Sequence, residues 1–344
     1  MLLFIQIIVF AFLFFLVYAS VAKYHPKDIE EVCHSSNPST LKEEQEYSVI
    51  TWNTGYCGLD KSMDFFYDGG TRMRTSMEET EKNLAGITQT ISDLQPVDFV
   101  MLQEVDVLSR RSYGINQFSA YCDKFGETHY AFAVNYDVPF VPLPLKSPMG
   151  KVIAGLATFG NYKPLNCVRY QFKVSFPWPK SAFMLDRCFM VNRYKITNDK
   201  ELLLINLHNS AFDKGGTLRQ KESIQLRDFM IAEYEKGNYI IAGGDWNQLP
   251  KGFSPHFTDY VFDTKDCVEM IPDLLPNDWI FAFDNTVPTN RQVVTPFNKS
   301  ITPTRVIDFF LLSPNVELVE VHNHDYAFEY SDHNPVKLRF KMKP

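Results

Sequence analysis

Residues 239–247 read YIIAGGDWN, an apolar run that ends directly in Asp245 and Asn247. A short run that is apolar on both faces is typical of a strand buried in the middle of a sheet. The polar residues stand at its carboxyl end, where a side chain can emerge from a rigid sheet into a cleft. This pattern, a buried strand that ends in polar groups, recurs along the chain, and its recurrence indicates the fold.

Similar β-rich runs recur from residue 47 onward. They are YSVITWN (47–53), DFVMLQEV (98–105), HYAFAVNY (129–136), KVIAGLATF (151–159), CFMVNRYKI (188–196), ELLLINLHN (201–209), RVIDFFLLS (305–313) and PVKLRFKM (335–342). Two amphipathic helices are predicted between them, one over 77–94 and one that opens with a capping-box pattern at Thr217 and Gln220 and closes near Gly237. The combination predicts an α/β fold in which two central sheets pack face to face with helices outside. Residues 138–149 and 285–304 are expected to be surface loops near a site.

The composition is that of a globular chain. Of its 344 residues, 45% are apolar and 22% are charged, which excludes a disordered or low-complexity protein. The net charge of −7 argues against sequence-indifferent DNA binding without excluding a local basic groove. The length would allow two domains, but one large two-sheet domain is the simpler interpretation.

The first 22 residues contain no charged residue. As a helix they would span about 33 Å, enough to cross the apolar core of a bilayer. We predict a transmembrane anchor, with a cleaved signal peptide as the close alternative, since Ser20 and Ala22 would form a small-residue cleavage site. A buried core helix is the third and least favoured interpretation. Either main interpretation predicts that the remainder lies outside the cytoplasm, anchored to the membrane, or secreted if residues 1–22 are removed.

Residues 23–46 are polar and are expected to be a mobile tether, which leaves residues 47–344 as the folded domain. The chain has 6 cysteines without the CxxC or Cys/His spacing of zinc sites, so structural zinc is not expected. Their disulfide pairing cannot be chosen from the sequence.

Polar side chains end or follow the apolar runs at six places. These residues are Asn53, Gln103 and Glu104, His208 and Asn209, Asp245 and Asn247, Asp308, and Asp332 and His333. Taken alone, an Asp after a strand is usually a turn residue or a helix cap. Several carboxylates that converge without partners would be costly in the absence of a cation, so convergence of these strand ends predicts a metal site.

The order of the motifs WN, LQE, LHNS, GDWN, IDFFLLS and SDHNPV resembles that of the endonuclease/exonuclease/phosphatase superfamily, which has the DNase I-like fold. The resemblance extends from about residue 47 to the C-terminus. It implies a four-layer αββα sandwich of two packed mixed sheets. It also implies hydrolysis of a phosphate ester with the help of a divalent cation, Mg²⁺ or Mn²⁺.

The resemblance also implies roles for the strand-end residues. Glu104, together with Asn53 and Asp332, would hold the cation through oxygen ligands. His333, oriented by Asp308, would act as the general base toward an attacking water.

Five further positions have predicted roles or alternatives. Asp245 and Asn247 would position the water or hold the phosphate, and His208 would donate a hydrogen bond to a non-bridging oxygen. Arg110 and Arg111 follow the LQE motif and could contact a substrate phosphate. A solvated face with ion pairs explains these two arginines equally well.

We therefore predict a membrane-anchored or secreted metal-dependent phosphohydrolase, and within this class a phosphodiesterase. An extracytoplasmic nuclease and a sphingomyelinase-like phospholipase are nearly level, so the substrate is a phosphate ester of nucleic acid or phospholipid. The apolar segment 138–145 could contact lipid, although a proline-rich loop packed on the domain is the preferred interpretation. The alternatives are an inositol-phosphate phosphatase and a non-catalytic binding protein on the same fold. No obligate protein partner is evident.

Overall fold

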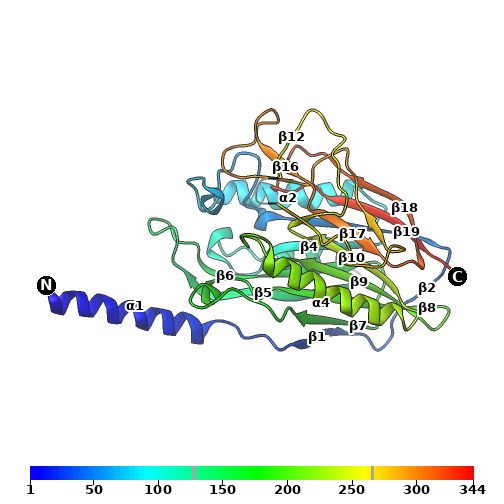
Figure 1. Cartoon of the computed structure of the whole chain (residues 1–344), viewed down its shortest axis with the longest axis horizontal. Coiled ribbons are helices and arrows are strands. Elements are labelled where there is room, and N and C mark those ends of the chain that lie inside the picture. The colour runs from blue at the N-terminus through cyan, green and yellow to red at the C-terminus, as the bar shows by residue number, and fades with distance from the viewer. Residues whose placement is uncertain (126–128, 265–266) are drawn as a thin grey trace.

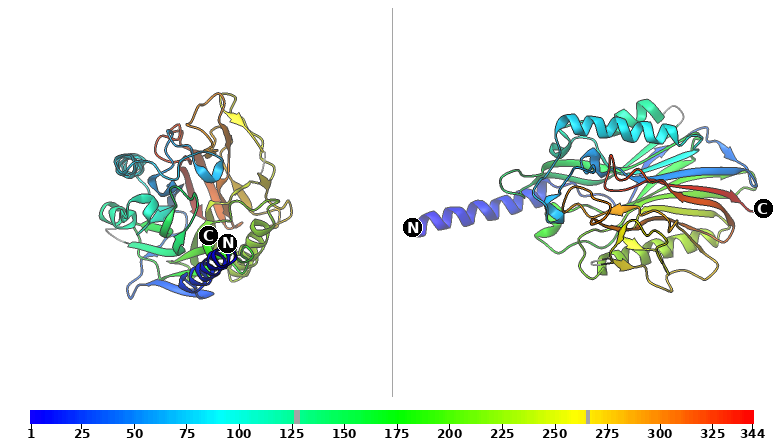
Figure 2. Two further views of the ribbon diagram at one scale, coloured as in Figure 1. Left: turned by 90° about the vertical axis from the view of Figure 1, so that its left-hand side faces the viewer. Right: turned by 90° about the horizontal axis from the view of Figure 1, so that it is seen from above.

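Two β-sheets packed face to face form the centre of the molecule, and helices cover their outer faces (Figure 1). The computed structural model describes residues 1–125, 129–264 and 267–344. In the view from above, helices α2 (Met77–Asp93) and α4 (Thr217–Tyr234) lie on opposite sides of the paired sheets (Figure 2). The predicted four-layer α/β sandwich is therefore confirmed.

The larger sheet is mixed. Its strands in spatial order are β1 (Ile29–His34), β7 (Asn166–Gln171), β8 (Cys188–Ile196), β9 (Glu201–His208), β10 (Tyr239–Asp245), β17 (Asp308–Leu312) and β14 (Ile280–Ala282), with β2 (Thr40–Leu41) beside β8. Strand β10 runs parallel to β9 and antiparallel to β17. The apolar run 239–245 is thus a central strand, buried along its whole length.

The smaller sheet has the order β18 (Val316–Asn323), β19 (Val336–Met342), β3 (Glu46–Asn53), β4 (Phe99–Asp106), β6 (Gly150–Gly160) and β5 (His129–Val141). Each β-rich run predicted from the sequence is a strand in one of the two sheets. Strands β1, β7 and β18 and helix α3 (Gln117–Phe125) were not predicted, because their sequences alternate weakly or carry several charged and polar residues.

Apolar side chains fill three layers between the elements. The inner faces of the sheets meet in a core that includes Val49, Phe99, Met101, Leu204 and Phe310. A second cluster packs α2 on the smaller sheet, and a third packs α4 on the larger one. Burial of each such Leu, Ile or Phe side chain contributes about 1.5–3 kcal/mol, so the layers hold the strand ends in fixed positions.

The two predicted helices begin where the sequence indicated, but the cap expected at α4 is not formed. Ser76 Oγ accepts a hydrogen bond from the backbone N of Glu79 and caps α2. At α4 the predicted capping box of Thr217 and Gln220 is wrong, because Gly216 is the N-cap and has no side chain to accept a bond. Asp213 Oδ2 instead accepts from the backbone N of Leu218 at 2.6 Å.

Short elements connect the main strands and helices. They are η1 (Gly55–Cys57), η2 (Phe66–Asp68), η3 (Arg110–Ser112), η4 (Lys180–Phe183), β11 (Gln248–Leu249), β12 (Val261–Phe262), β13 (Val268–Glu269), β15 (Asn290–Arg291) and β16 (Pro303–Arg305). The stretch 285–304, expected as a loop, therefore contains two short strands. Part of the stretch 138–149 belongs to β5, which continues to Val141.

Helix α1 (Leu2–Ala22) projects from the domain, and only Leu16 and Ala19 in it are buried. It is long and apolar enough to cross a membrane. The following segment, 23–46, differs from the mobile tether that was expected, because β1 and β2 lie within it and pair with the larger sheet.

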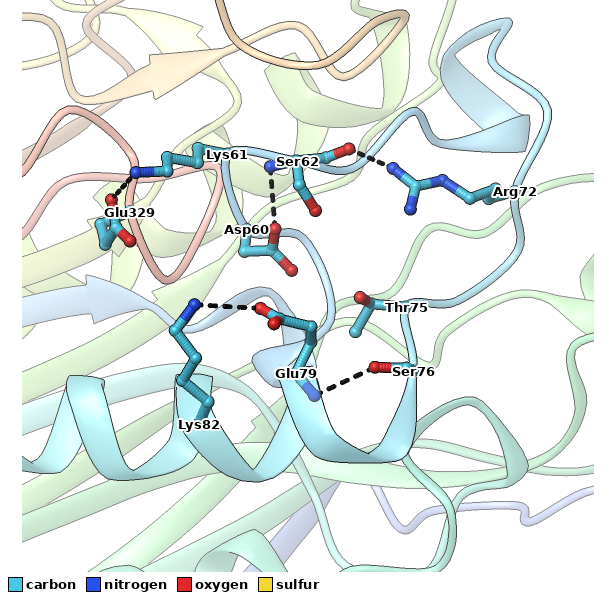
Figure 3. Close-up of a pocket in the computed structure, with 9 residues that line it drawn as sticks. All are labelled: Asp60, Lys61, Ser62, Arg72, Thr75, Ser76, Glu79, Lys82 and Glu329. Atoms are coloured by element: carbon cyan, nitrogen blue, oxygen red, sulfur yellow. Dashed lines mark hydrogen bonds and ion pairs between the residues drawn. The ribbon is translucent and has the colours of Figure 1, made fainter.

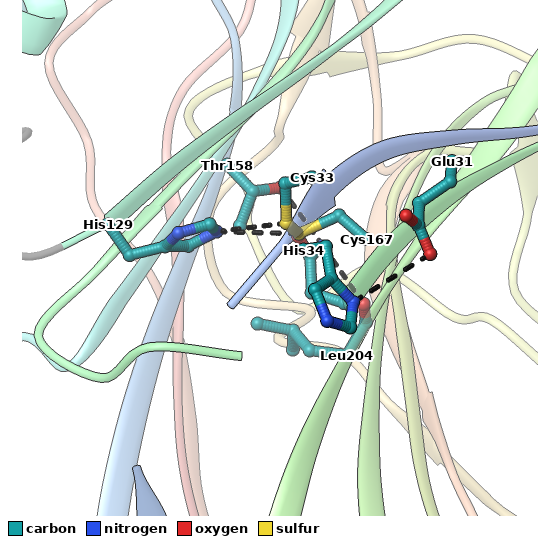
Figure 4. Close-up of a disulfide and its surroundings, with 8 residues drawn as sticks. Glu31, Cys33, His34, His129, Thr158, Cys167 and Leu204 are labelled. Atoms are coloured by element: carbon teal, nitrogen blue, oxygen red, sulfur yellow. Dashed lines mark hydrogen bonds and ion pairs between the residues drawn. A yellow bond between two sulfur atoms is a disulfide. The ribbon is translucent and has the colours of Figure 1, made fainter. Parts of the chain in front are cut away.

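A disulfide between Cys33 and Cys167 joins β1 to β7 (Figure 4). The two cysteines face each other in the strand register, and their Cα atoms are 4.8 Å apart. His129 Nε2 lies 3.4 Å from Cys167 Sγ, and burial lowers the pKa of His129 to about 4. Short polar strands such as β1 bury little apolar surface, so the covalent link explains how this charged segment joins the sheet.

Candidate active site

Three of the predicted residues form one row across the larger sheet. Asp245 at the end of β10 is in register with His208 on β9 and with Asp308 on β17. Adjacent strands lie about 4.8 Å apart, so register alone places the three side chains side by side.

The smaller sheet supplies Asn53 and Glu104 through parallel strands β3 and β4. The pairing of β4 with β6 shifts register between Leu102 and Val105, and Glu104 within this bulge has a φ of 56°. A bulge changes the direction in which a strand presents its side chains. The bulge takes the Glu104 side chain out of the regular alternation of β4. The sequence pattern does not reveal this change of direction.

Gln103, the neighbour of Glu104, has a structural position between the sheets. Its Nε2 donates to Thr51 Oγ1 at 3.0 Å and to Asn206 Oδ1 on β9 at 2.8 Å. Asn206 Nδ2 in turn donates to the carbonyl of Ala157 at 2.9 Å. These buried bonds fix the two sheets relative to each other, and thus the two halves of the site.

Asp245 lies at the centre of the cluster. Its Oδ2 accepts a hydrogen bond from Asn53 Nδ2 at 3.0 Å, and His208 Nε2 and His333 Nε2 lie 3.4 and 3.7 Å from the same oxygen. Its Oδ1 accepts from the backbone N of Asn247 at 2.9 Å. Burial raises the pKa of Asp245 to about 6.

His333 is held by residues on two sides. Its Nδ1 lies 2.8 Å from Asp308 Oδ2, and its Nε2 lies 3.0 Å from Asn290 Nδ2. Burial opposes protonation of His333, but the carboxylates of Asp308, Asp332 and Asp245 outweigh it and raise the pKa of His333 to about 10. A bound cation would oppose this effect of the carboxylates.

The segment that carries His333 is bonded to the end of β3. Trp52 Nε1 donates to the carbonyl of His333 at 2.8 Å, and Ser331 Oγ donates to the carbonyl of Asn53 at 2.8 Å. Gly55, with a φ of +51°, lies so close that a Cβ there would be 2.8 Å from Asp332 Oδ1. The WN motif therefore positions both Asp332 and His333.

The predicted metal ligands fit a hard divalent cation. Asn53 Nδ2 lies 3.3 Å from Glu104 Oε1, which places these two residues in contact. Burial raises the pKa of Asp332 to about 7, with a further upward contribution from Glu104. Neighbouring carboxylates whose charges repel each other gain from an intervening cation, and oxygen donors are those that Mg²⁺ prefers.

Asp245, Asp308 and His333 form a second group in which one ligand-type atom from each lies within 4.8 Å of the others. In this group Asp308 Oδ2 is already paired with His333 Nδ1. That pairing suits orientation of the imidazole better than ligation of a metal.

Two of the predicted residues have neighbours that the sequence did not indicate. Burial lowers the pKa of His208 well below its usual value, and Arg187 adds to the effect. Arg187 is 7% exposed and its Nη1 lies 3.4 Å from the carbonyl of His208. Asn247 has a φ of 52° and its Nδ2 donates to the carbonyl of Asn209 at 3.0 Å.

The sequence gives little indication that Arg187 and Asn290 lie in the site. Arg187 stands just before a strand rather than after one, and Asn290 lies in the irregular stretch 285–304. The only signal for Asn290 was the expectation that this stretch lies near a site. Nothing in the sequence distinguished Arg187 from other arginines.

The two arginines after the LQE motif differ in position. Arg111 is buried, pairs with Asp106 at 2.8 Å and lies over the ring of Tyr56. Its guanidinium is therefore part of a structural ion pair, which corrects the substrate-binding role suggested for it. Arg110 is exposed and donates to the carbonyl of Pro148.

A separate surface pocket of about 330 Å³ lies at the N-terminal end of α2 (Figure 3). Its charged side chains pair within the pocket or at its edge, as Lys82 does with Glu79 at 3.2 Å and Lys61 does with Glu329. None of the predicted site residues lines this pocket. The buried carboxylate and histidine cluster is therefore the candidate active site.

Comparison with known proteins agrees with this geometry. The model of the Endonuclease/Exonuclease/phosphatase family matches residues 50–333. No curated protein matches the chain.

Solved structures share the fold at low sequence identity. An endonuclease/exonuclease/phosphatase from Beutenbergia cavernae has a TM-score of 0.57 at 15% identity, covering 87% of this chain and 72% of that one. The D. rerio TDP2 complexed with single strand DNA product has a TM-score of 0.53 at 15% identity, covering 87% and 100%. The human Nocturnin catalytic domain has a TM-score of 0.54 at 14% identity, covering 89% and 97%.

Proposed function

The chain belongs to the endonuclease/exonuclease/phosphatase family, and on this basis we propose that it is a membrane-anchored phosphodiesterase that uses Mg²⁺. Members of the family are metal-dependent hydrolases of phosphate esters. The observation that carries the proposal is the His333–Asp308 pair, 2.8 Å apart, beside the buried carboxylate of Asp245.

In this proposal His333 is the general base. In its neutral form, with the Nδ1 proton directed to Asp308, the Nε2 lone pair can take a proton from water. Asp308 fixes the orientation of the ring and stabilises the imidazolium that forms. Asp245 accepts a hydrogen bond from the attacking water and keeps it close to Nε2, because its Oδ2 lies 3.7 Å from that atom.

Residues from the other sheet would bind the phosphate and the cation. Glu104, Asn53 and Asp332 would hold Mg²⁺, and Mn²⁺ could replace it because it accepts the same oxygen donors. When bound, the cation supplies Lewis-acid stabilisation of the charge that develops on the phosphoryl oxygens. His208 donates a hydrogen bond to a non-bridging oxygen, and Asn247 helps to hold the same group.

The anchor in this proposal is α1. Its length and its exposed apolar surface support a membrane span, and the catalytic domain would then lie outside the cytoplasm. A cleaved signal peptide would instead release the domain, and the intact mass of the mature protein separates these outcomes. A mass that includes residues 1–22 supports the anchor, whereas a mass without them shows secretion.

The test of the activity is hydrolysis of a generic phosphodiester with Mg²⁺, with EDTA as the control. A panel of DNA, RNA, sphingomyelin and inositol phosphates then separates the nuclease, phospholipase and phosphatase alternatives. Turnover that requires Mg²⁺ supports the proposal. If no substrate in the panel is hydrolysed, the alternative of a binding protein on this scaffold is favoured.

A further inference from the structure

The C-terminal part of α1 is attached to the catalytic domain by specific contacts. The ring of Phe15 stacks on Phe183 with centroids 5.8 Å apart, and Trp178 Nε1 donates to Ser20 Oγ at 3.1 Å. Lys23, the first charged residue, pairs with Asp186 at 3.0 Å. These contacts place the C-terminal part of α1 against segment 173–184.

Apolar side chains are exposed next to this boundary. In the segment after β5, Leu143 is 45% exposed and Leu145 is 83% exposed, and in the segment before β8, Trp178 is 61% exposed. Phe140, 37% exposed, has its ring centroid 6.2 Å from that of Phe15 in α1. We call these four residues, with Phe212, the apolar rim.

Exposed lysines lie in the same two segments, with Asp137 and Asp186 just outside them. Residues 138–151 and 173–184 contain Lys146, Lys151, Lys173 and Lys180 and no acidic residue. Apolar side chains interspersed with lysines are the composition of surfaces that bind anionic bilayers, because the side chains enter the headgroup region while the lysines contact phosphates.

The apolar rim lies at the catalytic end of the sandwich. Asp186 forms the ion pair with Lys23. The next residue is Arg187, whose Nη1 contacts the carbonyl of His208. Phe212 is 55% exposed, in the segment that follows β9 and His208. Figure 1 shows α1 leaving one end of the domain and the C-terminus, which follows β19, at the opposite end. The end of β5, which contacts α1 through Phe140, lies beside the start of β6, and the start of β6 lies beside the end of β4 that carries Glu104.

Tyr67 joins these parts of the rim. Its hydroxyl donates to the carbonyl of Leu143 at 3.2 Å, and its ring centroid lies 6.4 Å from that of Phe212. The apolar rim therefore extends without a break from the C-terminal end of α1 to the segment that follows His208.

We propose that the apolar rim rests on the bilayer that α1 spans, so that the active site opens toward the membrane surface and takes phosphodiesters of lipid headgroups. This inference rests on the proposed phosphodiesterase activity and anchor. It assigns the substrate to the lipid class. A soluble or nucleic acid substrate would gain nothing from an apolar rim directed at the bilayer.

A fluorescence experiment tests the orientation without relying on activity. The chain has 4 tryptophans, and Trp52, Trp246 and Trp279 are each no more than 5% exposed. In the full chain carrying Trp178→Phe, a reporter is placed at the rim by Leu145→Trp. The matched control is Tyr130→Trp in the same background, because Tyr130 is 51% exposed at the other end of β5.

Both proteins are reconstituted into vesicles that contain anionic phospholipid and a phosphatidylcholine brominated on its acyl chains. Bromine is expected to quench the reporter at position 145 and not the one at position 130. Equal quenching at the two positions, or none at 145, would overturn the orientation.

An activity experiment tests the substrate class. The double variant Leu143→Asp, Leu145→Asp should hydrolyse a lipid phosphodiester in vesicles about tenfold more slowly, because two charges enter the headgroup region. Its hydrolysis of a soluble phosphodiester should be unchanged. Loss of both activities in a folded protein, or no loss of activity on vesicles, would contradict the proposal that the apolar rim contacts the bilayer. If the unaltered protein hydrolyses neither ester, the proposed function fails, while quenching still reports the orientation.

Discussion

The indole Nε1 of Trp52 donates a hydrogen bond to the backbone carbonyl of His333 at 2.8 Å. Trp52 belongs to the smaller sheet, whereas Asp308, which contacts the ring of the same histidine, belongs to the larger sheet. The position of His333 therefore depends on the packing of one sheet against the other.

Replacement of Trp52 by Phe should lower activity more than its effect on stability suggests. The variant keeps an aromatic ring but loses a buried hydrogen bond that contributes about 0.5–1.5 kcal/mol, so we expect about a tenfold fall in kcat with a modest fall in Tm. Trp279→Phe is the control, because Trp279 packs in the cluster under α4, away from the site. Equal losses of kcat in the two variants would contradict the positioning role of Trp52.

Replacement of Gly55 by Ala should weaken metal binding. The added Cβ would stand 2.8 Å from Asp332 Oδ1 and would displace this carboxylate. We expect the Mg²⁺ concentration for half-maximal activity to rise about tenfold or more. Gly252→Ala is the matched control, because Gly252 also has a positive φ, +69°, but nothing lies within 4 Å of its Cβ position. An unchanged Mg²⁺ requirement for Gly55→Ala would remove Asp332 from the metal site.

Replacement of Arg187 by Gln should weaken substrate binding. Arg187 is buried beside His208, and burial lowers the pKa of its guanidinium, to an extent limited by the carboxylates nearby. A cation in this position can donate to a phosphate, and its loss should raise KM by roughly tenfold to a hundredfold. Steady-state kinetics on a soluble phosphodiester measures this, with the more exposed Arg227→Gln as the control. A change in Tm without a change in KM would assign Arg187 a purely structural role.

The pH dependence of stability should show the contribution of Glu233. Burial alone would raise the pKa of this carboxyl, but hydrogen bonds from Arg193 and Lys236 lower it to about 2. Because the folded pKa lies below the usual glutamate value of 4.5, the stabilisation is present above pH 4.5 and is lost as the pH falls toward 2. The Tm difference between the unaltered protein and Glu233→Gln should therefore shrink over this range. Glu235→Gln, two residues on and exposed, should show no such trend; a constant difference for Glu233→Gln would contradict this assignment.

Much of the fold follows from local patterns in the sequence. Buried strands such as 239–245 are visible as apolar runs, and the polar residue that ends each run lies at the end of a strand. Register then determines which of these ends meet, and here it places Asp245 between His208 and Asp308. The sequence alone identifies candidate site residues, whereas the strand pairing shows that His208, Asp245 and Asp308 form one row across the larger sheet.

Other features depend on contacts between distant segments. The bulge that directs Glu104 arises from the pairing of β4 with β6, and the strand at 29–34 pairs with β7, to which the Cys33–Cys167 disulfide also links it. Asn290 contacts His333 only because the two segments bridge. Local patterns do not encode such pairings, so the expected tether and loops were the least accurate predictions.

Replacement of His333 by Ala tests the central claim most directly. The measurement is the rate of Mg²⁺-dependent hydrolysis of a soluble phosphodiester, with folding verified by circular dichroism and by Tm. If His333 is the general base, the rate should fall by roughly 10²–10⁴-fold in a folded protein. A folded His333→Ala protein that retains the full metal-dependent rate would contradict the account.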